Sequence, residues 1–344
     1  MTNKRITIYD IAKELGMSAS YVSRALNNYP LISEKIKEQV KKKAVELNYQ
    51  HNSQAANLRQ GASKTIGVVV PHINQSFFSD AIAGIEEVCF QNNHNLIICQ
   101  SHESYKRECL AVETLIHQNV DCILISVSAE TTTHNHLDAI NQHNIVLIQF
   151  DRYVDKTDGF KVVNDNMEAS FHAVESLIAE GYKRIAFIGG PEQLTIYKKR
   201  KEGYLNAIKK AGLIIPYNFI VGNALSEEKA VEIAEELLSM QNPPDAFFCV
   251  SDHQSLGVLK VANLLGIDVP RQLGIFGFAN EAFSEIINPT LSSVDQKSKE
   301  MGRQTANLYF ENQSNKTDKA DKDKIQIINS EIIVRQSSRK SSTK

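Results

Sequence analysis

Residues 6–27 read ITIYDIAKELGMSASYVSRALN, and their spacing predicts two short helices joined by a tight turn. Thr7 and Asp10 have the spacing of a capping box at the start of the first helix. Gly16 ends that helix, and Ser18 is placed to cap the second. Apolar residues recur at helical spacing in both segments: Ile8, Ile11, Ala12 and Leu15 in the first, and Val22, Ala25 and Leu26 in the second. Two amphipathic helices around a glycine turn indicate a helix-turn-helix.

A third helix is predicted to follow Ser33 and to complete a small three-helix core. Its apolar positions keep helical spacing at Ile36, Val40, Ala44 and Leu47. Any two helices around a glycine turn would share part of the first pattern, but a third helix so close by favours the helix-turn-helix. The run Lys41 to Lys43 lies on the outer side of this helix, where it is either a solvated face or a phosphate contact.

Charge is divided unevenly along the chain. Residues 1–64 contain 11 Lys and Arg against 5 Asp and Glu, a net charge of +6. Residues 65–344 contain 27 against 35, a net charge of −8, so the total of −2 hides a basic head on an acidic body. This asymmetry predicts that the head binds a polyanion such as DNA and that the body does not.

The motif residues of the head continue beyond the third helix. They are Thr7, Tyr9-Asp10, Ile11-Ala12, Gly16, Ser18, Val22-Ser23-Arg24, Asn27, Ser33, Leu47-Asn48-Tyr49, Asn52, Leu58-Arg59, Gly61 and Ile66-Gly67-Val68. With them the chain resembles the lactose/galactose repressor (LacI/GalR) family of bacterial transcription regulators, and similar phrases recur as far as Arg335. The resemblance implies a cytoplasmic homodimer that binds roughly palindromic, double-stranded operator DNA. It also implies control by a small-molecule effector, a sugar or sugar derivative, with no cofactor.

Beyond residue 64 the sequence alternates between short apolar runs and amphipathic helical stretches, which predicts parallel sheets covered by helices. Strands buried on both faces are predicted at 66–70, 96–99, 122–125 and 145–150, and again at 184–188, 247–250 and 274–278. Helices are predicted at 78–90, 106–117 and 227–238. The expected fold is an all-α helix-turn-helix head plus an α/β body of two parallel-sheet lobes with a central cleft, and this body resembles periplasmic sugar-binding proteins.

The expected domains are a head at 1–50, a hinge helix and linker at 51–62, a body at 63–338 and a disordered tail at 339–344. In the family the body chain crosses between its lobes three times, and we expect crossings near 160, 290 and 324. Lobe 1 would span about 63–160 plus 292–323, and lobe 2 about 161–291 plus 324–338. Residues 311–324 predict an exposed loop, and residues 327–335 predict the last strand.

DNA recognition is expected at the second helix, whose first residues face base edges if it enters the major groove. Ala19, Ser20 and Tyr21 match family positions that vary with the operator, although Tyr21 could instead pack into the head's own core. Arg24 offers a bidentate fork suited to guanine. Hydroxyl and amide positions resemble the family's phosphate contacts: Thr7, Tyr9, Ser18, Ser23, Asn27 and Ser33. Tyr49, another motif residue, is also expected to bind DNA.

Residues 52–60, NSQAANLRQ, predict a short hinge helix with Asn52 as its cap. The resemblance implies that two such helices enter the minor groove, with Ala55 allowing close approach and Leu58 wedging between base pairs. An ordinary linker, in which Leu58 covers the body, is the alternative. His51 stands where the family usually has Pro, and Ala56 stands where it usually has Arg, so this hinge is expected to be less rigid or to hold phosphate less firmly.

Parallel sheets bind ligands beyond the carboxyl ends of their strands, so the cleft is the predicted effector site. One or both rings of Phe77 and Phe78 are expected to face it. Arg152 and Arg200 resemble charged family positions that bind ligand hydroxyls, with surface ion pairs as the alternative. The full predicted set is Gln75, Phe77, Phe78, Asp151, Arg152, Arg200, Ser251, Asp252, Ala279 and Gln296.

Two departures from the family put a simple pentose or hexose in doubt. Ser251-Asp252 stands where many members have Asn-Asp, and Gly277-Phe278-Ala279-Asn280 stands where a GFDD-like turn would supply a carboxylate. Both changes remove polar groups from the expected cleft, whereas Gln296 keeps the family form. A modified sugar, a sugar phosphate, an oligosaccharide unit and a partner protein therefore stay open as effectors.

Other function classes find little support in the sequence. The turn Ile188-Gly189-Gly190-Pro191 lacks dinucleotide-binding spacing, and no GxSxG nucleophile motif occurs, so we expect no enzyme. His134 and His136 are interpreted as surface residues rather than as a zinc site. A secreted sugar-binding protein would need a signal peptide, and the N-terminal sequence shows no such apolar run and no membrane span. Five cysteines without metal-type spacing indicate reduced core thiols.

Overall fold

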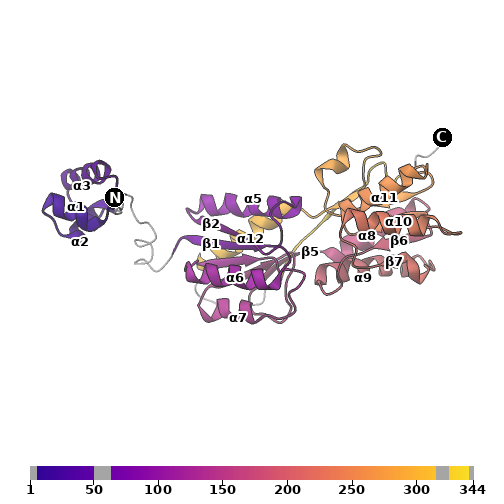
Figure 1. Cartoon of the computed structure of the whole chain (residues 1–344), viewed down its shortest axis with the longest axis horizontal. Coiled ribbons are helices and arrows are strands. Elements are labelled where there is room, and N and C mark those ends of the chain that lie inside the picture. Colours follow the sequence, from indigo (N-terminus) through magenta and orange to yellow (C-terminus); the bar gives the residue numbers. More distant parts are fainter. Residues whose placement is uncertain (1–5, 50–62, 315–324, 341–344) are drawn as a thin grey trace. The chain divides into compact units, whose positions relative to one another are not determined.

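A computed structural model describes residues 6–49, 63–314 and 325–340. It divides the chain into two compact units, residues 1–63 and residues 64–344, named the head and the body below. The described part of the head contains α1 (Ile8–Leu15), α2 (Ala19–Leu26) and α3 (Glu34–Glu46), drawn in indigo in Figure 1. Its fully buried side chains are Ile11, Val22, Ala25 and Val40, so the apolar pattern of the sequence is confirmed as one shared core.

The first lobe of the body is a parallel sheet with the strand order β11-β5-β4-β3-β1-β2. Its strands are β1 (Thr65–Val70), β2 (Asn95–Gln100), β3 (Cys122–Ile125), β4 (Val146–Phe150), β5 (Phe160–Asn164) and β11 (Ile325–Ile328). Helices α5 (Ser76–Gln91) and α12 (Ser298–Ser314) cover one face, and α6 (Tyr105–His117) and α7 (Asn135–Gln142) cover the other (Figure 1). Val68 and Val69 belong to the two opposite cores, because successive strand residues point to opposite faces.

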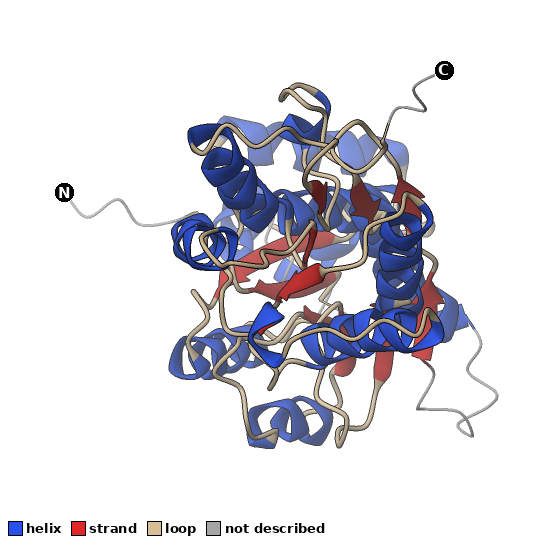
Figure 2. Ribbon diagram, turned by 90° about the vertical axis from the view of Figure 1, so that its right-hand side faces the viewer, coloured by secondary structure: helices blue, strands red, loops and turns tan. Residues whose placement is uncertain are grey.

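The second lobe repeats this plan around a sheet with the order β7-β6-β8-β9. Its strands are β6 (Ile185–Ile188), β7 (Ile220–Val221), β8 (Ala246–Cys249) and β9 (Gly274–Phe276). Helices α8 (Asn166–Ala179) and α9 (Thr195–Lys210) pack on one face, and α10 (Glu227–Leu238) and α11 (Asp252–Leu264) on the other. Short 3-10 helices η1 (Tyr217–Phe219) and η2 (Ala282–Glu285) lie in its loops. Figure 2 shows the helices of the body arranged on both sides of its strands.

The chain crosses between the lobes later than the sequence suggested. Residues 160–164 form β5 beside β4, and residues 325–328 form β11 beside β5, so both strands belong to lobe 1. The expected boundaries near 160 and 324 are therefore wrong by about one strand each. The apolar pattern of a strand does not show which sheet the strand joins, and only its hydrogen-bond partners decide the lobe.

The crossing segments meet at a small antiparallel sheet of β10 (Ser293–Asp295) and β12 (Glu331–Ile333). Asn164 ties all three together, because its side-chain amide donates to the carbonyl oxygens of Gln296 (2.9 Å) and Ile328 (3.3 Å). Val294 packs into the core of lobe 2, so β10 belongs to that side, and the lobe boundary expected at about 292 lies too early. The predicted single strand at 327–335 is wrong, since β11 and β12 pair in different sheets.

Two further expectations, for strand β2 and for the tail at 339–344, differ from the structure. Strand β2 is an edge strand with partly exposed residues, such as Ile98 at 46%, rather than a strand buried on both faces. Residues 339 and 340 of the predicted disordered tail are placed, and the backbone N–H of Lys340 donates to Glu180 (2.9 Å). Of the predicted loop at 311–324, residues 311–314 end α12, and the rest lies outside the described residues.

Candidate functional site

The turn between α1 and α2 forms as its residue types require. The carboxylate of Asp10 accepts hydrogen bonds from the backbone N–H (2.7 Å) and hydroxyl (2.6 Å) of Thr7, which fixes the start of α1. Gly16 adopts the left-handed conformation with φ 64°, and the hydroxyl of Ser18 accepts from the N–H of Tyr21 (3.2 Å). The orientation of α2 is therefore set by local chemistry as well as by the core.

The first turns of α2 present polar and aromatic side chains to solvent. Ser20 and Arg24 are exposed, Ala19 is half-buried, and the Tyr21 side chain is 38% exposed and lies outside the apolar core. The alternative in which Tyr21 packs into the head's core is thus not what the head adopts. The guanidinium carbon of Arg24 lies 5.8 Å from the centre of the Tyr29 ring. This face carries hydrogen-bond donors and acceptors, a cation and the partly exposed ring of Tyr21.

The predicted backbone-contacting residues of the head differ in their exposure. Thr7, Tyr9, Ser18, Asn27 and Ser33 are exposed, Tyr49 is half-buried, and Ser23 is buried at 9% exposure. Ser33 stands at the start of α3, but its side chain forms no capping hydrogen bond there. The hinge residues Asn52, Ala55 and Leu58 lie outside the described residues.

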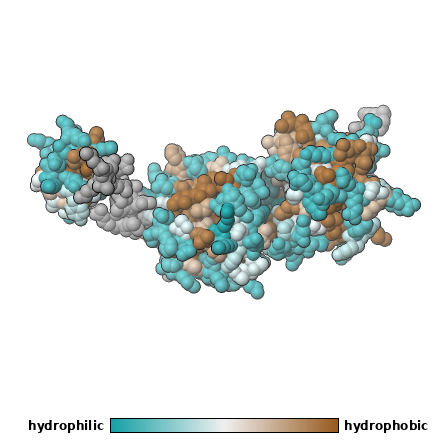
Figure 3. Space-filling model, viewed as in Figure 1, coloured by the Kyte–Doolittle hydropathy of each residue, from teal (hydrophilic) through white to brown (hydrophobic). Residues whose placement is uncertain are grey.

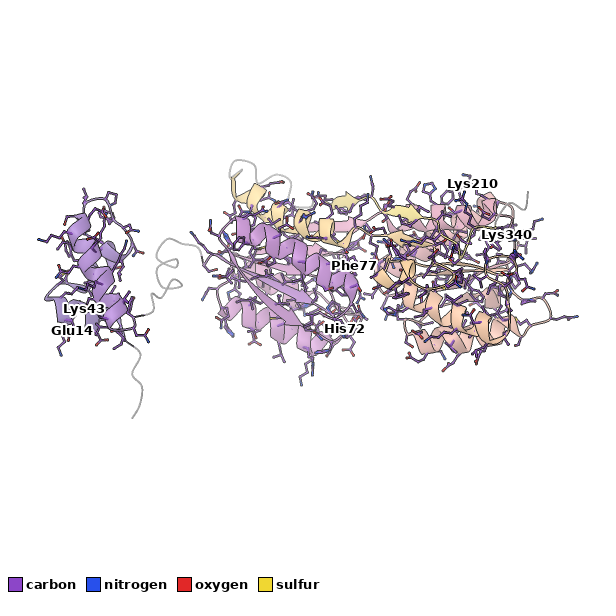
Figure 4. All side chains as sticks on the ribbon, turned by 90° about the horizontal axis from the view of Figure 1, so that it is seen from above. Glu14, Lys43, His72, Phe77, Lys210 and Lys340 are labelled. Carbon is purple, nitrogen blue, oxygen red and sulfur yellow. The ribbon has the colours of Figure 1, made fainter. Side chains whose placement is uncertain are left out.

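The lysine run on α3 has divided roles. Lys43 pairs with Glu46 at 2.7 Å, and Lys41 donates to the side-chain oxygen of Asn28 at 2.8 Å. Lys42 is exposed, and Figure 4 labels Lys43 beside Glu14 in the head. The run therefore supplies positive charge to the head's surface and stabilises its own helix at the same time.

A cavity of about 390 Å³ in the body is lined by residues of both lobes. Nine predicted effector residues line it: Gln75, Phe77, Phe78, Asp151, Arg152, Arg200, Ser251, Ala279 and Gln296. They follow β1, β4, β8, β9 and β10 or come from α9, as expected for a site beyond the carboxyl ends of parallel strands. Figure 4 shows Phe77 at the end of lobe 1 that faces lobe 2.

The two aromatic residues of α5 share the cavity and the core. Phe77 and Phe78 meet edge to face, with ring centres 5.2 Å apart. Phe78 is 2% exposed and belongs to the core of lobe 1, whereas Phe77 is half-buried. Both line the cavity, and Phe77, the more exposed of the two, is the ring more available for stacking.

Both cleft arginines are buried, which removes the alternative of surface ion pairs. The Nη1 of Arg152 donates to Glu103 at 2.8 Å, and its Nε lies 3.7 Å from Asp151. The Nε of Arg200 donates to Asn166 at 2.7 Å, and its Nη1 donates to the carbonyl oxygen of Val250 at 2.8 Å. These bonds fix both guanidiniums in place before any ligand arrives.

Burial shifts the titration of these groups in opposite directions. Loss of water raises the pKa of Asp151, although Arg152 and Arg200 oppose that shift. Loss of water also lowers the pKa of Arg200 to about 10. The guanidinium carbon of Arg200 lies 3.6 Å from the centre of the Phe278 ring, a contact that favours the charged form.

Asp252 does not line the cavity, which corrects its assignment as an effector contact. It is fully buried, and its Oδ2 accepts from the backbone N–H of Glu281 (2.7 Å) and the hydroxyl of Ser284 (3.2 Å). Its Oδ1 accepts from the hydroxyl of Ser293 at 2.7 Å. Burial raises the pKa of Asp252 to about 6. The carboxylate holds the loop that carries Ala279 and does not face a ligand.

Sequence reasoning missed several residues of the cleft: Glu103, Tyr197, Glu228, His253, Phe278 and Glu281. Tyr197 precedes Arg200 by almost one helical turn, so its position on the same face of α9 was a usable signal. No sequence signal indicated Glu103, because it follows β2 in a left-handed turn with φ 60°. Only the folded chain brings it to Arg152.

The histidine pair near residue 135 is only partly at the surface. His136 is 8% exposed, and its Nε2 lies 2.8 Å from Oε1 of the fully buried Glu108, which corrects its assignment as a surface residue. His134 pairs with Asp138 at 2.7 Å. Within the described ranges, no three His, Cys, Asp or Glu side chains form a metal-binding group. None of the helices described here combines the length and apolar character needed to cross a bilayer.

Comparisons with known proteins agree with this architecture. Residues 7–52 match the model "Bacterial regulatory proteins, lacI family", and residues 174–338 match a periplasmic binding protein-like domain. The HTH-type transcriptional repressor CytR of Escherichia coli (strain K12) is 30% identical over 305 residues, which is 89% of this chain and 89% of that protein.

Solved structures show the same fold over nearly the whole chain. A lac repressor dimer bound to operator and an anti-inducer superposes with a TM-score of 0.85 at 21% identity, over 98% of this chain and 100% of that one. A complex of the transcriptional regulator CelR with cellobiose has a TM-score of 0.72 at 23% identity, over 97% and 100%. The chain therefore belongs to the lacI family of bacterial regulatory proteins, and it is a DNA-binding transcriptional regulator.

Proposed function

We propose that this chain is a cytoplasmic repressor that binds a roughly palindromic operator as a homodimer. In this proposal a small-molecule effector, a sugar or sugar derivative, binds in the cleft and changes operator affinity. The observation that carries the proposal is the cavity lined from both lobes, in a chain whose head is a helix-turn-helix. An effector that binds one arrangement of the body better than another shifts the population toward it.

The DNA-contacting residues follow from the exposed face of the head. Ala19, Ser20, Tyr21 and Arg24 would read base edges, because the first turns of a recognition helix enter the major groove. Thr7, Tyr9, Ser18, Asn27, Ser33 and Tyr49 would contact the DNA backbone, and Asn52, Ala55 and Leu58 would form the hinge. Ser23 is left out of this set because its side chain is buried.

Exposed apolar residues on the body support the homodimer. Phe90 at the end of α5 is 76% exposed, Ile98 on β2 is 46% exposed and Leu110 on α6 is 52% exposed. Figure 3 shows hydrophobic residues gathered over α5 and β2 of lobe 1. Exposed apolar surface of this kind is typical of an interface between proteins.

The effector class rests on the chemistry of the cleft and on one related structure. Aromatic rings and charged groups with fixed positions suit a polyhydroxylated ligand, which stacks its apolar face and shares its hydroxyls with charged partners. The regulator CelR, which has the same fold, forms a complex with the disaccharide cellobiose.

Operator selection from random DNA tests the proposal. The purified chain should enrich a palindromic site, and the mass of the complex should correspond to two chains per site. Affinity should fall steeply with salt, because the basic head releases counterions from phosphate. Enrichment of no sequence, or binding of one chain per site, would contradict the proposal.

A further inference from the structure

Acidic groups outnumber basic groups on the wall of the cleft. Five carboxylates line the cavity, from Glu103, Asp151, Glu227, Glu228 and Glu281, against the two guanidiniums of Arg152 and Arg200. Counted from these carboxylates and guanidiniums, the lining carries a formal charge of −3. An anionic ligand would enter a site that already repels it, and low-dielectric walls strengthen that repulsion.

The two arginines do not offset this charge for an incoming anion. Arg152 is occupied by Glu103 and lies beside Asp151. Arg200 donates two of its nitrogens to Asn166 and to the carbonyl of Val250, which leaves Nη2 for a ligand. Arg152 donates to Glu103 through Nη1 alone, but Asp151 lies 3.7 Å from its Nε, so a phosphate would have to compete with two carboxylates for this guanidinium.

Glu281 differs from the other acidic residues because it reaches across the cleft. It lies on lobe 2 just before η2, and its Oε2 accepts the hydroxyl hydrogen bond of Ser76, at the start of α5 on lobe 1. Its backbone N–H is fixed by the buried Asp252. Glu281 lines the cavity, and among the described residues it has no ion-pair partner and uses Oε2 for its bond to Ser76, which leaves Oε1 for a ligand donor.

Because Ala279 has no polar side chain, the carboxylate of Glu281 is the group through which this loop can accept a ligand's hydrogen bond. Position 279 lines the cavity two residues before Glu281, and its methyl group offers no hydrogen bond. The same loop therefore supplies the cleft with one carboxylate, that of Glu281, two residues after position 279. Because Glu281 also holds Ser76, a donor that binds its carboxylate would act on both lobes at once.

We infer that the effector carries no negative charge, that it presents hydroxyl or ammonium donors, and that Glu281 accepts a hydrogen bond from one of them. This inference rests on the proposed function. It excludes sugar phosphates and nucleotides and admits neutral sugars, glycosides and amino sugars. Neutral sugars and glycosides offer hydroxyl donors, and amino sugars offer an ammonium donor as well. The experiment separates these two classes.

A matched thermal-shift panel with the full-length chain tests the inference. The panel pairs neutral hexoses, pentoses and disaccharides with their amino derivatives and their phosphates, and pairs nucleosides with their monophosphates. Compounds that raise the melting temperature should be neutral or cationic, and isothermal titration should then give their Kd. A stronger response to the amino derivative than to its neutral partner identifies an ammonium ligand, and the reverse identifies a hydroxyl ligand.

Variants then locate the contact. Glu281→Gln should weaken binding of the best compound at least tenfold while the unliganded melting temperature changes little. Glu285→Gln is the matched control, because Glu285 lies in η2, is 70% exposed at its side chain and pairs with Arg335 at 2.7 Å, outside the cavity lining. Its Kd should equal that of the unmodified chain.

Several results overturn the inference. They are a panel in which only phosphorylated compounds bind, a panel in which nothing binds, and a Glu281→Gln variant that binds as tightly as the unmodified chain. A phosphorylated compound that binds and changes operator affinity would overturn this inference alone and leave the proposed function intact. Failure to select any operator would overturn the proposed function itself.

Discussion

At the scale of single residues, Arg24 carries the clearest expectation for DNA recognition. Its side chain is exposed on α2, and a bidentate guanidinium contact with guanine is worth about 1–3 kcal/mol of discrimination. Arg24→Ala should therefore lower affinity for the selected operator by that amount and change affinity for random DNA much less. Competition binding with both DNAs at one salt concentration measures this. Lys42→Ala, which removes an exposed charge from α3, is the control and should weaken both DNAs alike.

Asp252 predicts a pH dependence of stability. Burial raises its pKa from 3.8 to about 6, so the folded chain binds this proton more tightly than the unfolded chain does. Stability from this group therefore falls as pH rises from about 4 to 7, by an amount on the order of 3 kcal/mol. Asp252→Asn should flatten that part of the curve relative to the unmodified chain. Urea unfolding at pH 4.5, 5.5 and 7 compares them, and parallel curves would refute the assignment.

At the scale of elements, α5 and α12 approach so closely that only glycine fits between them. A Cβ on Gly302 would lie 1.9 Å from the carbonyl oxygen of Ala81, and one on Gly84 would lie 2.1 Å from that of Lys299. Gly302→Ala must push the helices apart and should cost about 1–3 kcal/mol. Glu311→Ala, exposed near the end of α12, should change the free energy of unfolding by less than about 0.5 kcal/mol. Equal effects of the two changes would show that the crossing tolerates a methyl group.

At the scale of the whole molecule, ligand response and DNA binding should separate. Arg200→Ala removes a buried cleft donor and should abolish the effector's influence on operator affinity, while the unliganded chain still binds the operator. Lys199→Ala is the neighbouring control, since Lys199 is half exposed, pairs with Glu202 and does not line the cavity. Operator titrations with and without effector measure both. A normal response in Arg200→Ala would remove this residue from the site.

The site was partly predictable because several of its residues directly follow strands that local sequence patterns identify. Gln75, Phe77 and Arg152 follow strands that alternation identifies, and the ends of parallel strands share one edge of a sheet. Glu103 and Glu281 were not predictable in this way, since a loop's path depends on contacts remote in sequence. Asp252 carried a misleading signal. Its position after β8 predicts a cleft residue, but Ser284 and Ser293 turn its carboxylate inward.

The sequence by itself determined the head and the order of strands and helices in the body, because capping, glycine turns and apolar periodicity act within a few residues. Only the tertiary structure decided that β5 and β11 belong to lobe 1, since strand pairing joins residues up to 164 positions apart. It also decided which carboxylates face the cleft. Burial and hydrogen bonding across the fold set the directions of these carboxylates, and neither can be predicted from the local spacing of residues.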